Sequence, residues 1–270
     1  MISKIGLIGY GKMGSSLLIG GIKSGILKKE SIKVYDIDRS RAISAEKYGL
    51  RVANSLGEIL DSEVLILAVK PKDLPELLEK NRGTLVEKYP LLISIVAGIS
   101  VQRILSLLEG APLKVVRVIP NIAAAVNEAM SAFYANEFVS KEELAFVNSL
   151  LSGVGKSVIV ENEGDLDTIT GISGSGPAYF ALMINILENV AIENGLREDL
   201  ARVIAAQTCR GTASMILDGG HSSIELIKMV ASPGGTTQEA LRVMEDRGFS
   251  KIVLEAVAAA IAKSRAMNRS

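Results

Sequence analysis

The sequence has very few of the residues on which many catalytic and structural sites depend. Its 270 residues include no tryptophan, one histidine, His221, and one cysteine, Cys209. A Ser-His-Asp relay would have to use His221, and neither an intrachain disulfide nor a zinc site of several histidines and cysteines can form. We expect His221 at the surface or near a helix cap and Cys209 as a small core residue, and we predict no metal site.

An excess of charge of one sign and a long apolar run are also missing. Thirty basic residues balance thirty acidic residues, which argues against a general nucleic-acid binder. No run of about 18 apolar residues occurs, and glycines and lysines interrupt the N-terminal stretch, so neither a membrane span nor a signal peptide is expected. These absences predict a cytoplasmic protein with no membrane or nucleic-acid partner.

The residues that are present indicate a globular protein whose first half alternates short apolar runs with helical segments. Hydrophobic residues make up 48% of the chain, enough for a sizeable core. Apolar runs without polar alternation are typical of strands buried on both faces of a parallel sheet. The runs lie at residues 5–8, 32–35, 64–69, 91–96, 115–119 and 157–160, and helical segments lie at 13–24, 39–48 and 101–108. This order predicts a Rossmann-type, doubly wound α/β domain over residues 1–160.

Beyond Glu161 the strand-like runs stop and helical spacing dominates, which predicts an all-α domain over residues 161–270. Asp165 and Asp167 are expected to cap a long helix that begins there. The segment 179–191 is apolar on nearly every helical face. Because a helical domain of roughly 110 residues can scarcely surround such a helix, we expect a second copy of the chain to cover it.

A glycine pattern follows the first apolar run and precedes a helical segment. Gly9, Gly11 and Gly14 form a GxGxxG sequence, with Lys12 and Met13 inside it. The first glycine permits the tight turn, the second lets the backbone approach a pyrophosphate, and the third lets helix and strand pack closely. The free N–H groups at the start of the helix would then bind the phosphates of a dinucleotide.

Asp36 follows the second apolar run, about 20 residues after Gly14, where the acid that binds the ribose of such a cofactor is expected. A carboxylate there accepts hydrogen bonds from a free 2′-hydroxyl and repels a 2′-phosphate, which favours NADH over NADPH. Arg39 and Arg41 leave the alternative open, because either could turn inward to pair with a 2′-phosphate.

Two glycine-rich segments interrupt the helical half. They are SGSGPAY at residues 173–179 and SPGGTT at residues 232–237. Glycine and proline are costly inside a helical domain, so these segments suggest close approach of the backbone to a ligand or a neighbouring helix. Thr236 and Glu239 predict a capping box, and a helix start behind two glycines presents several N–H groups to an anion such as a carboxylate.

Six motifs, in order along nearly the whole chain, resemble those of the pyrroline-5-carboxylate reductase family. The most specific are the two glycine-rich segments of the helical half. The others are the glycine pattern, AVKP at 68–71, VAGIS at 96–100, and Arg117 with Pro120 and Asn121. The resemblance implies the last step of proline biosynthesis, in which NAD(P)H transfers a hydride to the cyclic imine 1-pyrroline-5-carboxylate. It also implies helical domains that interlock into homodimers, and often into decamers that are pentamers of dimers.

The resemblance, together with the glycine pattern, assigns the site residues. Candidate cofactor contacts are Gly9, Gly11, Lys12, Met13, Gly14, Asp36, Asn54, Ala68, Lys70, Pro71, Ala97 and Gly98. Candidate substrate contacts are Ser175, Ser232, Gly234, Gly235, Thr236 and Thr237. Thr237 would present its hydroxyl to the ring nitrogen as an orienting group of the catalytic site, because an unactivated hydroxyl is a poor general base at neutral pH.

The sequence departs from the family pattern at two places. Ile122 and Ala123 stand where family members often have Thr-Pro, and Asp36 and Ile37 stand where many have Asn-Arg. Three other functions stay open: a related imine reductase, a β-hydroxyacid dehydrogenase, or a non-catalytic nucleotide sensor. The dehydrogenase would be expected to have a catalytic lysine on its long interdomain helix, and residues 168–193 contain no lysine.

Overall fold

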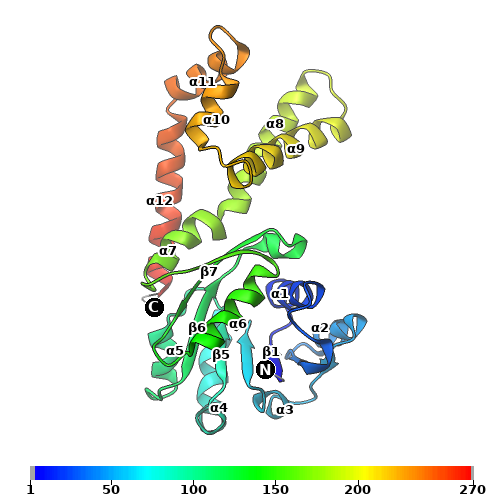
Figure 1. Ribbon diagram of the computed structural model, residues 1–270, viewed down its shortest axis with the longest axis vertical. Coiled ribbons are helices and arrows are strands. Elements are labelled where there is room, and N and C mark those ends of the chain that lie inside the picture. The colour runs from blue at the N-terminus through cyan, green and yellow to red at the C-terminus, as the bar shows by residue number, and fades with distance from the viewer. Residues whose placement is uncertain (1–3, 269–270) are drawn as a thin grey trace. The chain divides into compact units, whose positions relative to one another are not determined.

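The computed structural model describes residues 4–268, and these form two compact units (Figure 1). The first unit comprises the chain up to Gly174 together with the segment from Ala260 onward, and the helical unit comprises Ser175–Ala259. The strands end at Ile159, next to the predicted boundary at residue 160. The first unit continues beyond this point because the next short helices, and the end of the last helix, pack against it.

The first unit is built on one eight-stranded sheet. Its strands are β1 (Ile5–Ile8), β2 (Ile32–Tyr35), β3 (Arg51–Val52), β4 (Val64–Leu67), β5 (Leu91–Ser94), β6 (Lys114–Ile119), β7 (Ala129–Ala135) and β8 (Gly155–Ile159). They lie in the order β3-β2-β1-β4-β5-β6-β7-β8, and every neighbouring pair is parallel except β6 and β7. The predicted doubly wound sheet is confirmed, and the short strand β3 and the strand β7 are additional to the prediction.

Alternate residues of the central strands face two separate apolar cores. Leu7 points to the core that α1 and α6 cover, whereas Ile8 points to the core that α3, α4 and α5 cover. Each of these two side chains is at most 2% exposed. The apolar runs of the sequence therefore lack polar alternation because helices cover both faces of the sheet.

The helices of the first unit complete these two layers. They are α1 (Lys12–Lys23), α2 (Arg39–Ser44), α3 (Gly57–Leu60), α4 (Leu74–Lys88), α5 (Val101–Leu107), α6 (Lys141–Ser152) and α7 (Asp165–Ile169). Short 3-10 helices lie in the connections, namely η1 (Lys29–Ser31), η2 (Ala45–Tyr48), η3 (Pro71–Asp73) and η4 (Ile122–Val126), and a π-helix, η5 (Thr170–Gly174), follows α7.

The expected capping by Asp165 and Asp167 is wrong. The helix α7 has only five residues, and within the described chain no side chain caps its N-terminus. Asp167 is buried, and its carboxylate accepts hydrogen bonds from Ser264 and Asn268 near the end of the last helix. This acid therefore anchors a segment that is distant in the sequence, which no local pattern could indicate.

The helical unit has little core of its own. Its helices are α8 (Gly176–Glu193), α9 (Glu198–Leu217), α10 (Ser223–Val230), α11 (Thr236–Asp246) and the first part of α12 (Phe249–Asn268). On α8, the side chains of Phe180 and Leu182 are 62% exposed and that of Ile186 is 47% exposed. Such apolar exposure is typical of a surface that another polypeptide covers. Within residues 4–268, no helix has both the length and the apolar character needed to cross a membrane.

Candidate nucleotide and carboxylate sites

The glycine pattern lies where β1 runs into α1, and each glycine there has a distinct surrounding. Gly9 has a φ of +100°, and a Cβ at this position would lie 2.5 Å from the carbonyl oxygen of Ala68. A Cβ on Gly14 would lie 2.6 Å from the carbonyl oxygen of Gly9. A Cβ on Gly11 would meet no described atom within 4 Å. Two glycines are thus required by the protein's own packing, whereas Gly11 faces open space into which a ligand can fit.

The start of α1 is suited to an anion. Gly11 is the N-cap of this helix, and no described side chain accepts a hydrogen bond from its first turn. Lys12 is exposed and Met13 is half-buried at the first two positions. The N–H groups of the first turn and the positive end of the helix dipole therefore remain available for phosphate oxygens. The cradle fits the pyrophosphate of a dinucleotide.

Asp36 lies beside this cradle and is held in place by the backbone. Its carboxylate accepts hydrogen bonds from the N–H of Tyr10 at 2.7 Å and from the N–H of Asp38 at 2.8 Å. Both Asp36 and Gly11 line a cavity of about 650 Å³. Because each carboxylate oxygen can accept a second hydrogen bond, Asp36 can still receive a ribose hydroxyl.

The two arginines that follow Asp36 are bound to neighbouring side chains. Arg41 lines the cavity and forms an ion pair with Asp38 at 3.2 Å, and Arg39 donates to the side-chain oxygen of Asn54 at 3.3 Å. Hydrogen bonds from Ser40 lower the pKa of Asp38, so this partner stays charged. An inward turn of Arg41 onto a phosphate would break its pairing with Asp38.

The other candidate cofactor residues lie at the carboxyl ends of β4 and β5 or, for Asn54, just after β3, at the edge where doubly wound sheets bind ligands. Ala68 and Lys70 line the same cavity as Asp36, and Pro71 begins η3 directly afterwards. Ala97 is exposed and Gly98 is half-buried in the loop after β5. Asn54 is exposed after β3 and contacts Arg39.

Sequence reasoning did not assign several apolar residues of this cavity to the cofactor. Ile37, Leu56 and Leu77 all line it, and the side chain of Ile37 is 92% exposed. The N–H of Asp38 is bonded to Asp36, so the chain turns tightly at Ile37 and directs it outward. An apolar residue directly after a ribose-binding acid is the signal that could have pointed to it. Leu56 and Leu77 carry no such signal, because only the folding of α3 and α4 brings them to the cavity.

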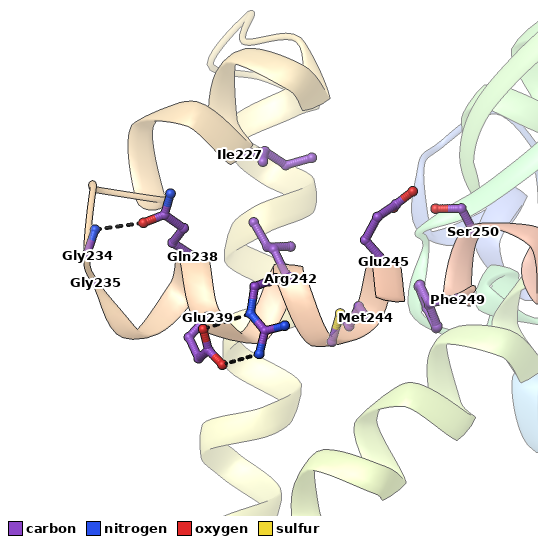
Figure 2. Close-up of a pocket in the computed structure, with 11 residues that line it drawn as sticks. Ile227, Gly234, Gly235, Gln238, Glu239, Arg242, Met244, Glu245, Phe249 and Ser250 are labelled. Carbon is purple, nitrogen blue, oxygen red and sulfur yellow. Dashed lines mark hydrogen bonds and ion pairs between the residues drawn. The ribbon is translucent and has the colours of Figure 1, made fainter. Parts of the chain in front are cut away.

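The SPGGTT segment forms the turn between α10 and α11, and its local structure corrects the predicted capping box. Gly235, not Thr236, is the N-cap of α11, and no side chain of the described residues caps it. Instead, Gln238 reaches back and its amide oxygen accepts the N–H of Gly234 at 2.7 Å (Figure 2). Gly234 has a φ of +73°, a conformation that suits glycine. Glu239 is bonded to Arg242 rather than to the turn.

The turn still presents groups suited to an anion. Thr236 and Thr237 are the first two residues of α11, so their N–H groups have no partner within the helix. Thr237 is half-buried, whereas Ser232, Gly234 and Thr236 are exposed. Gly234 and Gly235 line a cavity of about 800 Å³ together with Arg242 and Phe249 (Figure 2). Ser175, the remaining candidate, precedes the first residue of α8.

Two family models match successive parts of the chain. Residues 4–98 match the family described as NADP oxidoreductase, coenzyme F420-dependent, and residues 163–267 match pyrroline-5-carboxylate reductase dimerisation. The pyrroline-5-carboxylate reductase of Methanosarcina acetivorans is 38% identical over 269 residues, which is 98% of each chain. That of Synechocystis is 38% identical over 272 residues, which is 100% of each chain. The chain belongs to the pyrroline-5-carboxylate reductase family.

Solved structures of the family have the same fold over the full length. A pyrroline-5-carboxylate reductase from Coxiella burnetii matches with a TM-score of 0.93 and 30% identity over 100% of both chains. The Plasmodium falciparum pyrroline carboxylate reductase, solved with NADP bound, matches with a TM-score of 0.88 and 31% identity over 98% of both chains. The chain is thus an NAD(P)-dependent oxidoreductase of this family, and the match to the dimerisation model supports a homo-oligomer.

Proposed function

We propose that the protein reduces 1-pyrroline-5-carboxylate to L-proline with a reduced nicotinamide cofactor. The observation that carries this proposal is the match of the chain to curated reductases of that name, at 38% identity over 98% or more of both sequences. The cradle at Gly11 and the anion-binding turn before α11 supply the two binding functions that this reaction needs.

The proposed mechanism requires the side chains to bind and orient the reactants rather than to transfer protons. When bound, the nicotinamide supplies the hydride, and a protonated imine accepts it readily. The N–H groups of the turn bind the substrate carboxylate, and the hydroxyl of Thr237 bonds to the ring nitrogen and orients the imine. The protein thus positions the reactants and excludes water, which explains how a chain with a single histidine can perform the reaction.

The decisive test is the oxidation of NADH or NADPH on addition of 1-pyrroline-5-carboxylate, with L-proline identified as the product. A parallel assay with other cyclic imines and with β-hydroxyacids distinguishes the alternative enzymes. Cofactor binding measured without substrate provides a separate readout. If the protein binds the cofactor but reduces none of these compounds, the sensor alternative is favoured and the proposal is wrong.

The finer proposal on the cofactor is a preference for NADH. Asp36 is held by two backbone N–H groups and lines the cavity, and its carboxylate would repel the 2′-phosphate of a bound cofactor. We expect kcat/KM to be higher with NADH, and Asp36→Asn to reduce the preference by about tenfold. The relative from Plasmodium falciparum was solved with NADP, so the comparison must include both cofactors. A preference of the wild-type protein for NADPH would contradict the role of Asp36 and would indicate that Arg41 pairs with the 2′-phosphate.

The finer proposal on assembly is a homodimer formed by the helical units, with a decamer of five such dimers as its larger form. The exposed apolar side chains of α8, among them Leu182 and Ile186, support the dimer. Light scattering after size-exclusion chromatography measures the mass directly. A mass of one chain at micromolar concentration would contradict both forms.

A further inference from the structure

The last turns of α12, within the first unit, cover the loop that follows β5. Gly98 in this loop has a φ of +72°, and a Cβ at this position would lie 3.1 Å from the Cβ and 3.2 Å from the Cε of Met267. Gly171 approaches the same helix, since a Cβ there would lie 2.4 Å from Cγ1 of Ile261. The end of α12 therefore packs directly on the segment that contains Ala97 and Gly98.

A partly buried ion pair holds the other end of this loop. Glu163 accepts a hydrogen bond from the N–H of Val101, the first residue of α5, at 2.8 Å. The same carboxylate oxygen pairs with Arg117 on β6 at 2.9 Å, and the Arg117 side chain is only 3% exposed. Arg117 is also the register partner of Ser94, the last residue of β5. The loop thus begins and ends beside Arg117.

Asn268, in the last turn of α12, joins the helix to this ion pair. Its side-chain oxygen accepts a hydrogen bond from Nη2 of Arg117 at 3.0 Å, and its side-chain nitrogen donates to Oδ1 of Asp167. Ser264, one turn earlier, donates to the same Asp167 oxygen at 2.7 Å. Asn268 therefore bonds both to Asp167, which anchors the end of α12, and to Arg117, which belongs to the ion pair at the loop. The hydroxyl of Ser264 instead bonds to the anchoring residue Asp167.

We infer that Met267 and Asn268 are positioning residues for the nicotinamide half of the cofactor, acting through the loop at Ala97 and Gly98. The inference rests on the proposed function and on the family resemblance, which implies that Ala97 and Gly98 approach the nicotinamide half of the cofactor. Met267 packs against Gly98 within the loop, and Asn268 holds Arg117, whose partner Glu163 binds the N–H of Val101 at the end of the loop. The adenosine half would lie at Asp36, on a different part of the sheet edge.

The test compares Met267→Ala and Asn268→Ala with Ser264→Ala, which loses an anchor of α12 but keeps both contacts to the loop. Calorimetry measures the affinities for NADH and for AMP, which carries the adenosine half alone. Steady-state kinetics with NADH and with NADH deuterated at the transferred position measure kcat and its isotope effect. Thermal unfolding measures the stability of each variant.

For Met267→Ala and Asn268→Ala we expect kcat to fall about tenfold and the isotope effect to rise, because a less confined nicotinamide slows hydride transfer. The affinity for NADH should fall several-fold while that for AMP stays within about twofold. Ser264→Ala should lower the melting temperature and leave the kinetics and both affinities near those of the wild type.

Two results would overturn the inference. Unchanged kcat and NADH affinity in both variants would make the end of α12 a structural anchor only, and equal losses of NADH and AMP affinity would indicate general damage to the first unit. Failure of the proposed function is distinguishable from these results, because the wild-type protein would then form no proline while the two binding measurements would still test the loop.

Discussion

The two units of this protein differ in how they bury their apolar side chains. In the first unit, sheet and helices of the same chain cover each other, and residues such as Leu7 and Leu18 are completely buried. In the helical unit, the buried hydrophobic residues among those described are Ala201, Ala205 and Leu226, while much larger side chains are exposed. The first unit has the core of an independent domain, whereas the helical unit needs a partner to complete its own.

The difference extends to function. The cradle at Gly11 is formed by a strand, a turn and a helix whose positions the local core determines. The turn before α11 lies in the unit that has little core of its own, and Gln238 and Arg242 form their bonds at an exposed surface (Figure 2). We therefore expect mutations to act locally in the first unit and through assembly in the helical unit.

The largest expected effect comes from charging the exposed apolar face of α8. Leu182→Asp would bury an unpaired carboxylate in the proposed interface of the homo-oligomer, so the variant should dissociate or fail to fold. Asn189→Asp adds the same charge at a polar, exposed position of the same helix and should assemble normally. Light scattering gives the mass of each variant. A Leu182→Asp protein with the wild-type mass and activity would show that this face is not covered.

A core mutation in the first unit should lower the free energy of unfolding by an amount that does not depend on protein concentration. Leu18→Ala removes a fully buried side chain of α1 and should lower the free energy of unfolding by about 2–5 kcal/mol. Leu254→Ala changes a side chain that is 71% exposed in the helical unit, and its effect should vary with concentration because it acts on assembly. Urea denaturation at two protein concentrations measures both. If the loss of unfolding free energy in Leu18→Ala depended on protein concentration, the expected difference between the two units would be contradicted.

A mutation in the turn should affect catalysis more than folding. Thr237→Ala removes a hydrogen bond of about 0.5–1.5 kcal/mol, so kcat/KM for the imine should fall about twofold to tenfold, or about a hundredfold if a charged partner makes the bond worth roughly 3 kcal/mol. The melting temperature should hardly change, because Gly235 is the N-cap of α11. Thr237→Ser keeps the hydroxyl and should retain most of the activity. A Thr237→Ala variant with unchanged kcat/KM would leave orientation of the imine to the backbone groups.

The smallest expected effect concerns two ion pairs of different exposure. Burial raises the pKa of Glu143, but hydrogen bonds from Lys114 and Ser140 lower it more, and the net pKa lies below the usual 4.5. A carboxyl with a lowered pKa adds stability above pH 4.5, and this stability is lost as the pH falls through the folded-state pKa.

Glu143→Gln should therefore lower the free energy of unfolding by about 0.5–1 kcal/mol at pH 7 and by less at pH 3. Glu239 forms an exposed ion pair with Arg242, so Glu239→Gln should change the pH dependence of the free energy of unfolding less than Glu143→Gln does. Urea denaturation between pH 3 and pH 7 tests the comparison, and equal pH profiles for the two variants would remove the distinction.

The elements that could be predicted from the sequence are those with strong local signals. The strands at 5–8 and 32–35 have the bounds of β1 and β2, because their apolar runs end at residues that leave the sheet. The runs at 64–69 and 91–96 continue two residues beyond β4 and β5, because the loops after these strands also contain buried apolar residues such as Val96. The strand β7, with the sequence AMSAFYA, was missed since its small residues carry no strong strand signal.

Within the candidate sites, the structure confirms the turn conformations expected of the glycines, while their contacts to ligands stay predictions. Gly9 and Gly234 have positive φ values, and the glycines of both motifs stand out in the sequence by themselves. Helix caps were predicted less well. Thr236 and Glu239 match the capping-box spacing, but Arg242 binds Glu239 and Gln238 takes the N–H of Gly234, so two competing side chains decided the outcome.

The sequence alone determined the class of fold, the change from strands to helices near residue 160, and the position of the glycine turns. Hydrophobic period and the steric freedom of glycine act over a few residues, so they can be recognised without knowledge of the rest of the chain. Only the tertiary structure decided that Asp167 binds Asn268 and that Met267 covers Gly98. These contacts join residues about a hundred or more positions apart, and their free energy depends on packing that forms only when the sheet, α7 and the end of α12 come together.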